Sequence, residues 1–300
     1  MIISTRSLPD APSRNCRRWM RRTLIALTGF VAAAPVAAQG SLGASSHIAV
    51  VNGIELHYRM AGTGQPLLLL HGYGWSGEQW DRFIPALAED FRLLIPDMRG
   101  HGRSSMPPGN FLQRDVAADM LALLDLLGLT KIAAVGHSGG ANALYLAAAV
   151  APERFASLVV IGAQHEFTDQ NRMAMQATPD LEGLPEPVRR AMMRAHPGGR
   201  PQIDWLLAQF RQLGANRDDL NLTLDRLSQI QARVLIIAGD REEVGLALRE
   251  KRSIPGASLW VVPSQGHFPF WDDFGGSALA AEFFPRLMRE FVGTGVAAAR

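Results

Sequence analysis

The sequence predicts an α/β fold in which a mostly parallel sheet carries helices on both faces. Short, wholly apolar runs alternate with longer segments of helical periodicity, which is the pattern of parallel strands joined by helical crossovers. Runs without polar alternation indicate strands that are buried on both faces. The chain of 300 residues is long enough for one large domain with an insertion. Eight segments have strand character: 47–51, 54–59, 67–70, 93–95, 132–135, 158–161, 234–238 and 259–262.

The first two of these segments are expected to pair as a hairpin. Between them lies Asn52-Gly53, a dipeptide that suits a two-residue turn. The later runs are separated by helical segments, of which the clearest spans 115–127. Gly128 follows that segment and favours the left-handed conformation that ends many helices.

One interval, residues 165–230, breaks the alternation. It has no strand-like run and holds helical fragments separated by prolines, which end or kink helices. We expect a helical cap inserted into an α/β core formed by residues 39–164 and 231–300. Such a cap would lie over the carboxyl ends of the strands, where ligands bind in open α/β sheets. The cap side chains expected to shape a pocket are Met173, Trp205 and Phe210.

Residues 1–38 have the composition of an export signal. They hold six of the 30 basic residues and one of the 28 acidic residues. An uncharged apolar run of about 15 residues follows, too short for a comfortable membrane span, and Val36-Ala37-Ala38 suits cleavage after Ala38. The sequence around Arg17-Arg18 is similar to a twin-arginine signal. We therefore expect a bacterial protein that is exported, periplasmic or secreted, and whose mature form has no stable membrane span.

Composition excludes several partner classes. Without the first 38 residues the chain has a slight excess of acidic residues, so no basic surface points to a nucleic acid. The single cysteine, Cys16, lies in the expected signal, so the mature chain needs neither disulfides nor thiol chemistry. The sequence shows no cluster of potential metal ligands with suitable spacing, so we expect neither a metal nor a cofactor. The sequence does not indicate an oligomeric state.

The pentapeptide Gly136-His137-Ser138-Gly139-Gly140 predicts a catalytic nucleophile. An apolar run precedes it and an alanine-rich helical segment follows, so the serine is expected on a sharp turn between strand and helix. Gly136 and Gly140 would let the strand and the helix approach closely. Ser138 would then project at a helix N-terminus, whose free N–H groups can stabilise an anion.

A serine hydroxyl needs a base, and the base needs a group that holds its tautomer. His267 follows the last apolar run, beside Gly266, and is the candidate base. The acid is expected in the loop after 234–238, where Glu242 is favoured and Asp240 and Glu243 are alternatives. Packing or structural roles are expected for the other histidines, with pocket lining an alternative for His165: His47, His57, His71, His101, His137, His165 and His196.

An oxyanion hole needs two donors aimed at the developing negative charge. The Gly139 N–H, directly after the nucleophile, is the first candidate. The second is the Tyr73 N–H, because glycines flank Tyr73 in the loop that follows the apolar run 67–70.

Over residues 47–293 the chain resembles the α/β-hydrolase family. The motifs that carry the resemblance are His71-Gly72-Tyr73-Gly74, Asp97-Met98-Arg99-Gly100-His101-Gly102-Arg103-Ser104, Gly136-His137-Ser138-Gly139-Gly140, Gly239-Asp240-Arg241-Glu242 and Gly266-His267. The resemblance implies an eight-stranded sheet, a triad of Ser138, His267 and the acid, and a structural role for Asp97 and His101. The family's usual aspartate in the acid loop is Glu242 here.

Residues 151–163 are similar to the esterase, lactonase and perhydrolase-like branches of that family. Epoxide hydrolases and haloalkane dehalogenases carry aspartate at the nucleophile position, so Ser138 argues against both activities. The expected function is hydrolysis of a small carboxylic ester or lactone through an acyl-enzyme. A C–C bond hydrolase, a cofactor-free perhydrolase or a peptidase would use the same triad, and a low-turnover ligand-binding sensor could keep the same fold.

Overall fold

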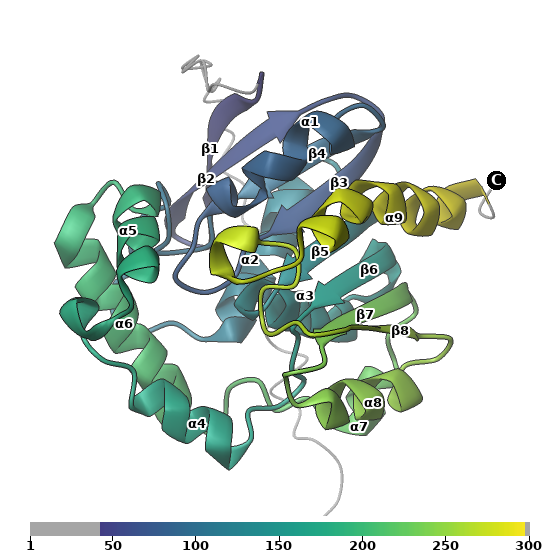
Figure 1. Ribbon diagram of the computed structural model, residues 1–300. Helices are drawn as coiled ribbons and strands as arrows, with labels where there is room; N and C mark the ends of the chain where they lie inside the picture. Colours follow the sequence, from purple (N-terminus) through teal and green to yellow (C-terminus); the bar gives the residue numbers. More distant parts are fainter. Residues whose placement is uncertain (1–42, 298–300) are drawn as a thin grey trace, which may run out of the picture. The chain divides into compact units, whose positions relative to one another are not determined.

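The computed structural model describes residues 43–297, and within them a single sheet orders its eight strands β1-β2-β4-β3-β5-β6-β7-β8 (Figure 1). The strands are β1 (Ser45–Val51), β2 (Ile54–Ala61), β3 (Gln65–Leu70), β4 (Phe91–Pro96), β5 (Ile132–His137), β6 (Phe155–Ile161), β7 (Arg233–Gly239) and β8 (Ser258–Val262). The predicted fold class, a mostly parallel sheet with helices on both faces and a helical insertion, is confirmed.

The β1–β2 hairpin is the antiparallel edge of the sheet. Val51 pairs with Ile54, and the two residues between them, Asn52 and Gly53, have φ values of 46° and 79°. A two-residue turn of this kind needs positive φ at both positions, which explains the Asn-Gly dipeptide. β2 also pairs antiparallel with β4, whereas the pairs from β4 through β8 are parallel.

Helices cover both faces of the sheet. They are η2 (Gly77–Phe83), α1 (Ile84–Leu87), α2 (Gln113–Leu126), α3 (Gly139–Val150), η3 (Pro152–Arg154), α4 (Asp169–Gln176), η4 (Leu181–Gly183), α5 (Glu186–Ala195), α6 (Gly199–Ala215), α7 (Leu224–Leu227), α8 (Val244–Ser253), η5 (Asp272–Phe274) and α9 (Ala278–Ala297). α2 begins two residues before the predicted 115–127 segment, and Gly128 after it has a φ of 66°.

Alternate side chains of the central strands pack into two apolar cores, one on each face of the sheet. On β3, Leu68 and Leu70 join a core with α2 and α3, while Leu67 and Leu69 join a second core with α1 and α9. Both faces of the strand are therefore buried, which is why its sequence shows no polar alternation. In Figure 1, α1 and α9 lie on one face, with α2 and α3 behind the sheet.

The insertion between β6 and β7 is helical. It contains α4, α5, α6 and α7, and its one isolated β-bridge within the described residues joins Glu166 and Asn221. The helix α6 packs over the loops that follow β3 and β4, because the Tyr73 hydroxyl donates to Leu206 O and the Gln202 amide donates to Gly100 O. Of these helices, α4, α5 and α6 gather at one side of the sheet, whereas α7 lies beside α8 (Figure 1).

The division into a core of 39–164 and 231–300 and a cap of 165–230 stays a prediction. The signal expected at residues 1–38 lies outside the described residues, so export also stays a prediction. Among residues 43–297, no helix combines the length and apolar character needed to cross a membrane.

The bend between β5 and α3 depends on two glycines. A Cβ added to Gly140 would lie 2.4 Å from His71 O, and one added to Gly136 would lie 2.7 Å from Ala141 Cα. Both contacts are with backbone atoms, which cannot move aside as a side chain would. The strand and the helix therefore approach more closely than any larger residue allows, as the sequence predicted.

Replacing Gly140 with alanine should destabilise the fold. The new methyl group would force β3 and α3 apart, and overpacking of this kind costs about 2 kcal/mol or more of unfolding free energy. Gly245→Ala is the matched control, because a Cβ there meets nothing within 4 Å and the residue lies in α8. Urea unfolding measures both variants. Equal stability of the two would contradict the packing argument.

Candidate active site

Ser138 lies at the tip of the turn from β5 into α3, at φ 51° and ψ −120°. Its own N–H donates to Ile161 O on the neighbouring strand at 2.8 Å, and its carbonyl accepts from Asn142 N at 2.9 Å. The residue is therefore held between the sheet and the first turn of α3. N–H groups in that turn have no partner within the helix, so they face the serine with partial positive charge.

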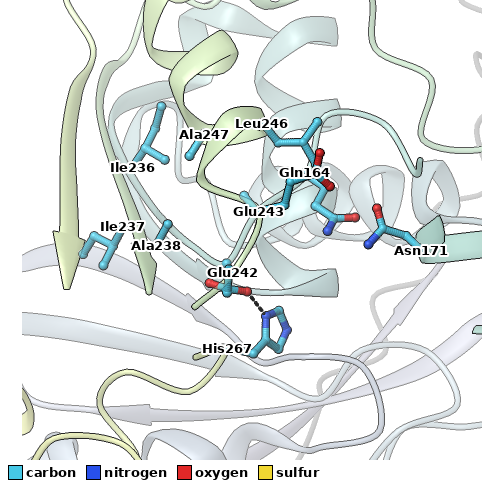
Figure 2. Close-up of a pocket in the computed structure, with 12 residues that line it drawn as sticks. Gln164, Asn171, Ile236, Ile237, Ala238, Glu242, Glu243, Leu246, Ala247 and His267 are labelled. Atoms are coloured by element: carbon cyan, nitrogen blue, oxygen red, sulfur yellow. Dashed lines mark hydrogen bonds and ion pairs between the residues drawn. The ribbon is translucent and has the colours of Figure 1, made fainter. Parts of the chain in front are cut away.

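His267 and Glu242 meet from two adjacent loops. His267 follows β8, Glu242 follows β7, and His267 Nδ1 lies 2.6 Å from Glu242 Oε1 (Figure 2). A carboxylate only accepts, so Nδ1 carries the proton and Nε2 is left as a hydrogen-bond acceptor. Glu242 Oε2 accepts from Gly239 N at 3.2 Å, which fixes the carboxylate against the end of its own strand.

Gly162 makes room for this pair at the end of β6. Its φ is 59°, and an added Cβ would lie 2.9 Å from both Cε1 and Nδ1 of His267. The imidazole thus packs directly on the backbone of the strand beside the serine.

The two alternative acids lie elsewhere. Asp240 Oδ1 accepts from Gln265 N at 3.1 Å, which ties the acid loop to the loop of His267. Glu243 is exposed and begins α8 without a hydrogen bond from its side chain. Of the three carboxylates that the sequence offered, the structure brings Glu242 into contact with His267.

The two expected oxyanion donors are close together. An added Cβ on Gly139 would lie 3.3 Å from Tyr73 N, so the loop after β3 packs on the first turn of α3. The Tyr73 N–H has no hydrogen-bond acceptor within the described part of the chain. Its ring is fixed between Phe111 and Phe210, at centroid distances of 6.1 and 4.9 Å.

A cavity of about 240 Å³ joins these groups. Ser138, His267, Gly139 and Tyr73 all line it. Its remaining walls combine amide and apolar side chains with two small residues: Gln113, Asn142, Gln164, Asn171, Phe167, Met175, Phe210, Gly162 and Ala174. The sequence alone did not indicate the four amides, which come from four separate segments.

A second cavity of about 290 Å³ lies on the Glu242 side of His267. Side chains of β7 and α8 form much of its wall, and Figure 2 shows Ile236, Ala238 and Leu246 around it. It shares Gly162, Gln164, Asn171 and His267 with the first cavity. His267 therefore stands between two adjoining spaces.

Only one of the three cap residues expected to shape the pocket does so. Phe210 lines the cavity, but Met173 points outward from α4 and is 63% exposed. Trp205 packs instead on Gly100, where an added Cβ would lie 2.3 Å from its ring. The proline-rich sequence gives no reliable helix register, so it could not show which face of each cap helix is turned inward.

His165 also lies outside the cavity. It is 2% exposed, and its Nδ1 lies 3.0 Å from the fully buried Glu250, whose other oxygen accepts from Tyr145. The packing role expected for it is confirmed.

Buried imidazole and amide groups connect the two loops at the site. The Gly72 N–H donates to Gln79 Oε1 at 2.8 Å, and Gln79 Nε2 lies 2.9 Å from His137 Nδ1. His137 Nε2 in turn lies 2.8 Å from His267 O. A carbonyl only accepts, so Nε2 of neutral His137 is the donor, and Nδ1 accepts from Gln79. One continuous chain of hydrogen bonds therefore fixes the Tyr73 loop relative to the His267 loop.

His71 and His101 brace the same region as neutral side chains. His71 Nε2 accepts from Met98 N, and His101 Nε2 accepts from Gly74 N, so both rings carry their proton on Nδ1. Burial lowers the pKa of His71 to about 4 and places the pKa values of His101 and His137 well below the usual range. Asp97 accepts from Gly77 N and Arg103 N, which agrees with a structural role.

A family model described as alpha/beta hydrolase fold matches residues 65–189. The protein has the α/β-hydrolase fold. Its hydrolase fold also agrees with the crystal structure of a meta-cleavage product hydrolase from Pseudomonas fluorescens IP01, at a TM-score of 0.69 and 23% identity over 83% of this chain and 97% of that chain.

Several curated relatives of this chain carry hydrolase names. The soluble epoxide hydrolase of Corynebacterium sp. (strain C12) is 45% identical over 102 residues, which are 34% of this chain. That match spans 36% of the relative's length. The serine hydrolase BPHL of Homo sapiens is 29% identical over 271 residues, covering 84% of this chain and 90% of that protein. The family and these relatives together indicate a hydrolase.

The neutral histidines should make stability depend on pH. The pKa of His71 is lowered by folding from about 6.5 to about 4, so the unfolded chain takes up this proton first as the pH falls. Its stabilisation is complete above pH 6.5 and is lost toward pH 4. Between pH 7.5 and 4.5 the wild type should lose about 2 kcal/mol more than His71→Gln, which keeps a neutral donor and acceptor.

Urea unfolding of both proteins at each pH measures this difference. The comparison is needed because burial raises the pKa values of Glu250, Asp119 and Asp219. Raised carboxyl pKa values stabilise the folded state as the pH falls, which opposes the effect of His71, and they contribute equally to both proteins. Equal losses in the two proteins would contradict the assignment of a neutral, buried His71.

Proposed function

We propose that the protein is a serine hydrolase that cleaves a small carboxylic ester or lactone through an acyl-enzyme. One observation carries the proposal. Ser138, held at positive φ, shares a cavity with His267, whose Nδ1 lies 2.6 Å from the Glu242 carboxylate. This is the set of roles that nucleophilic catalysis by serine needs: nucleophile, base and a group that orients the base.

In the proposed reaction, Ser138 Oγ attacks the carbonyl carbon of the ester while His267 Nε2 takes the hydroxyl proton. The tetrahedral intermediate collapses, the C–O bond to the leaving alcohol breaks, and His267 returns the proton to that oxygen. Water then attacks the acyl-enzyme while His267 takes its proton. The bond between the acyl carbon and Ser138 Oγ breaks, His267 returns the proton to Oγ, and the carboxylic acid is released. Glu242 stays ionised and stabilises the imidazolium that forms twice in each cycle.

The N–H groups of Tyr73 and Gly139 are the proposed oxyanion donors. Supporting this role, the Tyr73 N–H is without an acceptor in residues 43–297, and α3 begins with a free N–H at Gly139. Donors fixed in this way stabilise charge that develops in the transition state, and each contributes about a hundredfold or more in rate.

Serine at the nucleophile position favours ester chemistry over epoxide opening, in which the family uses aspartate. The relative named serine hydrolase matches most of both chains, whereas the one named epoxide hydrolase matches about a third of each. A C–C bond hydrolase or a perhydrolase would use the same three side chains, and a ligand-binding sensor would keep the cavity without turnover. A panel of substrates separates these alternatives.

Ser138→Ala should abolish ester hydrolysis. Without the nucleophile, kcat on 4-nitrophenyl esters of two to eight acyl carbons should fall by about a thousandfold or more, because the triad acts as a unit. Release of 4-nitrophenol measures the rates, and circular dichroism checks that the variant is folded. Equal, slow release by both proteins would exclude the serine hydrolase and leave the sensor.

Three single substitutions identify the acid. Glu242→Gln should lower kcat/KM by about a hundredfold or more, because the amide can hold the wrong imidazole tautomer. Asp240→Asn keeps an oxygen for Gln265 N, and Glu243→Gln changes an exposed side chain, so both should stay within about threefold of the wild type. A larger loss of kcat/KM in Asp240→Asn than in Glu242→Gln would identify Asp240 as the acid of the triad.

A further inference from the structure

A third cavity, of about 130 Å³, lies between the cap helices α5 and α6 and the loop after β3. Tyr73 and Phe210 line both this cavity and the Ser138 cavity, so the two spaces meet at these residues. The proposed chemistry at Ser138 leaves the third cavity unused. Much of its wall consists of aliphatic side chains from the cap: Leu184, Val188, Met192, Leu206 and Leu207.

The wall of this cavity suits a hydrocarbon. No lysine, arginine, aspartate or glutamate is among the described residues that line it. Its two hydroxyl groups are already bonded, since Tyr73 OH donates to Leu206 O at 3.0 Å and Thr178 Oγ1 donates to Ala174 O at 3.4 Å. Protein interiors leave few voids of this size, and an apolar recess beside a reactive group is the usual form of a ligand site.

The place of His267 decides which part of an ester can reach the third cavity. In the proposed reaction the leaving oxygen receives its proton from His267 Nε2, so the alcohol part of the substrate lies toward that side chain. His267 lines the 290 Å³ cavity beside Glu242 and does not line the third cavity (Figure 2). The third cavity is reached instead past Tyr73, whose N–H is a proposed oxyanion donor. The acyl part is therefore the part that can extend into it.

The volume of the third cavity sets the length of the acyl chain. An apolar cavity of about 150 Å³ holds one benzene molecule, so a slightly smaller one holds a chain segment of about four to six carbons. The carbons nearest the carbonyl occupy the Ser138 cavity, which gives an acyl group of about eight to ten carbons in all. Each CH₂ that enters an apolar site strengthens binding about fourfold, so chains that reach the third cavity are favoured over shorter ones.

We propose that the third cavity binds the end of the acyl chain, and that the substrate is an ester of an unbranched carboxylic acid of about eight to ten carbons. This proposal rests on the serine hydrolase function and names its substrate class. Val188 is the position on α5 from which the chain length can be controlled, because it lines the cavity and is half-buried.

Val188→Phe tests the proposal, because the added ring fills the third cavity. Leu184→Phe is a second filling variant, from a residue that also lines the cavity and is half-buried. Met193→Phe is the matched control, since Met193 lies on the same helix as Val188, is 45% exposed and does not line the cavity. The measurement is kcat/KM on 4-nitrophenyl butanoate and 4-nitrophenyl octanoate, both below their solubility limits. Each ratio comes from one protein sample, so partial unfolding of a variant cancels.

The wild type and Met193→Phe should prefer the octanoate by about thirtyfold, and each filling variant should reduce this ratio to about one while still hydrolysing the butanoate. A wild-type ratio near one, an unchanged ratio in a filling variant, or an equal fall in Met193→Phe overturns the acyl-chain site. The hydrolase function stands in each of these cases, because the butanoate is still cleaved. Absence of Ser138-dependent hydrolysis of both esters overturns the acyl-chain site and the hydrolase function together.

Discussion

The bend at Ser138 is the constraint on which the rest of the site depends. A non-glycine residue at positive φ is strained by about 1–3 kcal/mol and persists only where its surroundings enforce it. Here the Ser138 N–H is bound to β6, and its neighbours Gly136 and Gly140 allow contacts with backbone that no side chain would permit. Packing of α3 on the sheet thus compensates for the strain, and the same packing brings the Tyr73 loop against Gly139.

A second principle is the use of buried neutral groups to position flexible loops. His71, His101 and His137 each donate with one ring nitrogen and accept with the other, so each can bridge two backbone segments without a charge. Desolvation keeps them neutral, since an imidazolium there would lack an acceptor for one of its protons. The loop of Tyr73 and the loop of His267 are in this way held as one unit with Gln79.

Much of the site could be predicted because parallel strands end at a common edge. Ser138, His267 and Tyr73 each follow a wholly apolar run, and topology alone brings such positions together. The choice of Glu242 among three carboxylates needed geometry, because neighbouring loop residues point in different directions. The amides of the cavity could not be foreseen, since Gln113 depends on where α2 begins and Asn171 on how the cap docks. The prediction that Met173 lines the pocket was wrong because it also depended on how the cap docks.

The central claim is that the hydroxyl of residue 138 is the activated nucleophile of a hydrolase. Labelling with a fluorophosphonate probe followed by peptide mapping tests it most directly, because the probe phosphonylates only a serine that a nearby base activates. One adduct is expected, on the peptide containing Ser138, and it should be lost in His267→Ala. An adduct on a different residue, or ester hydrolysis that continues at full rate in the absence of any adduct, would contradict it.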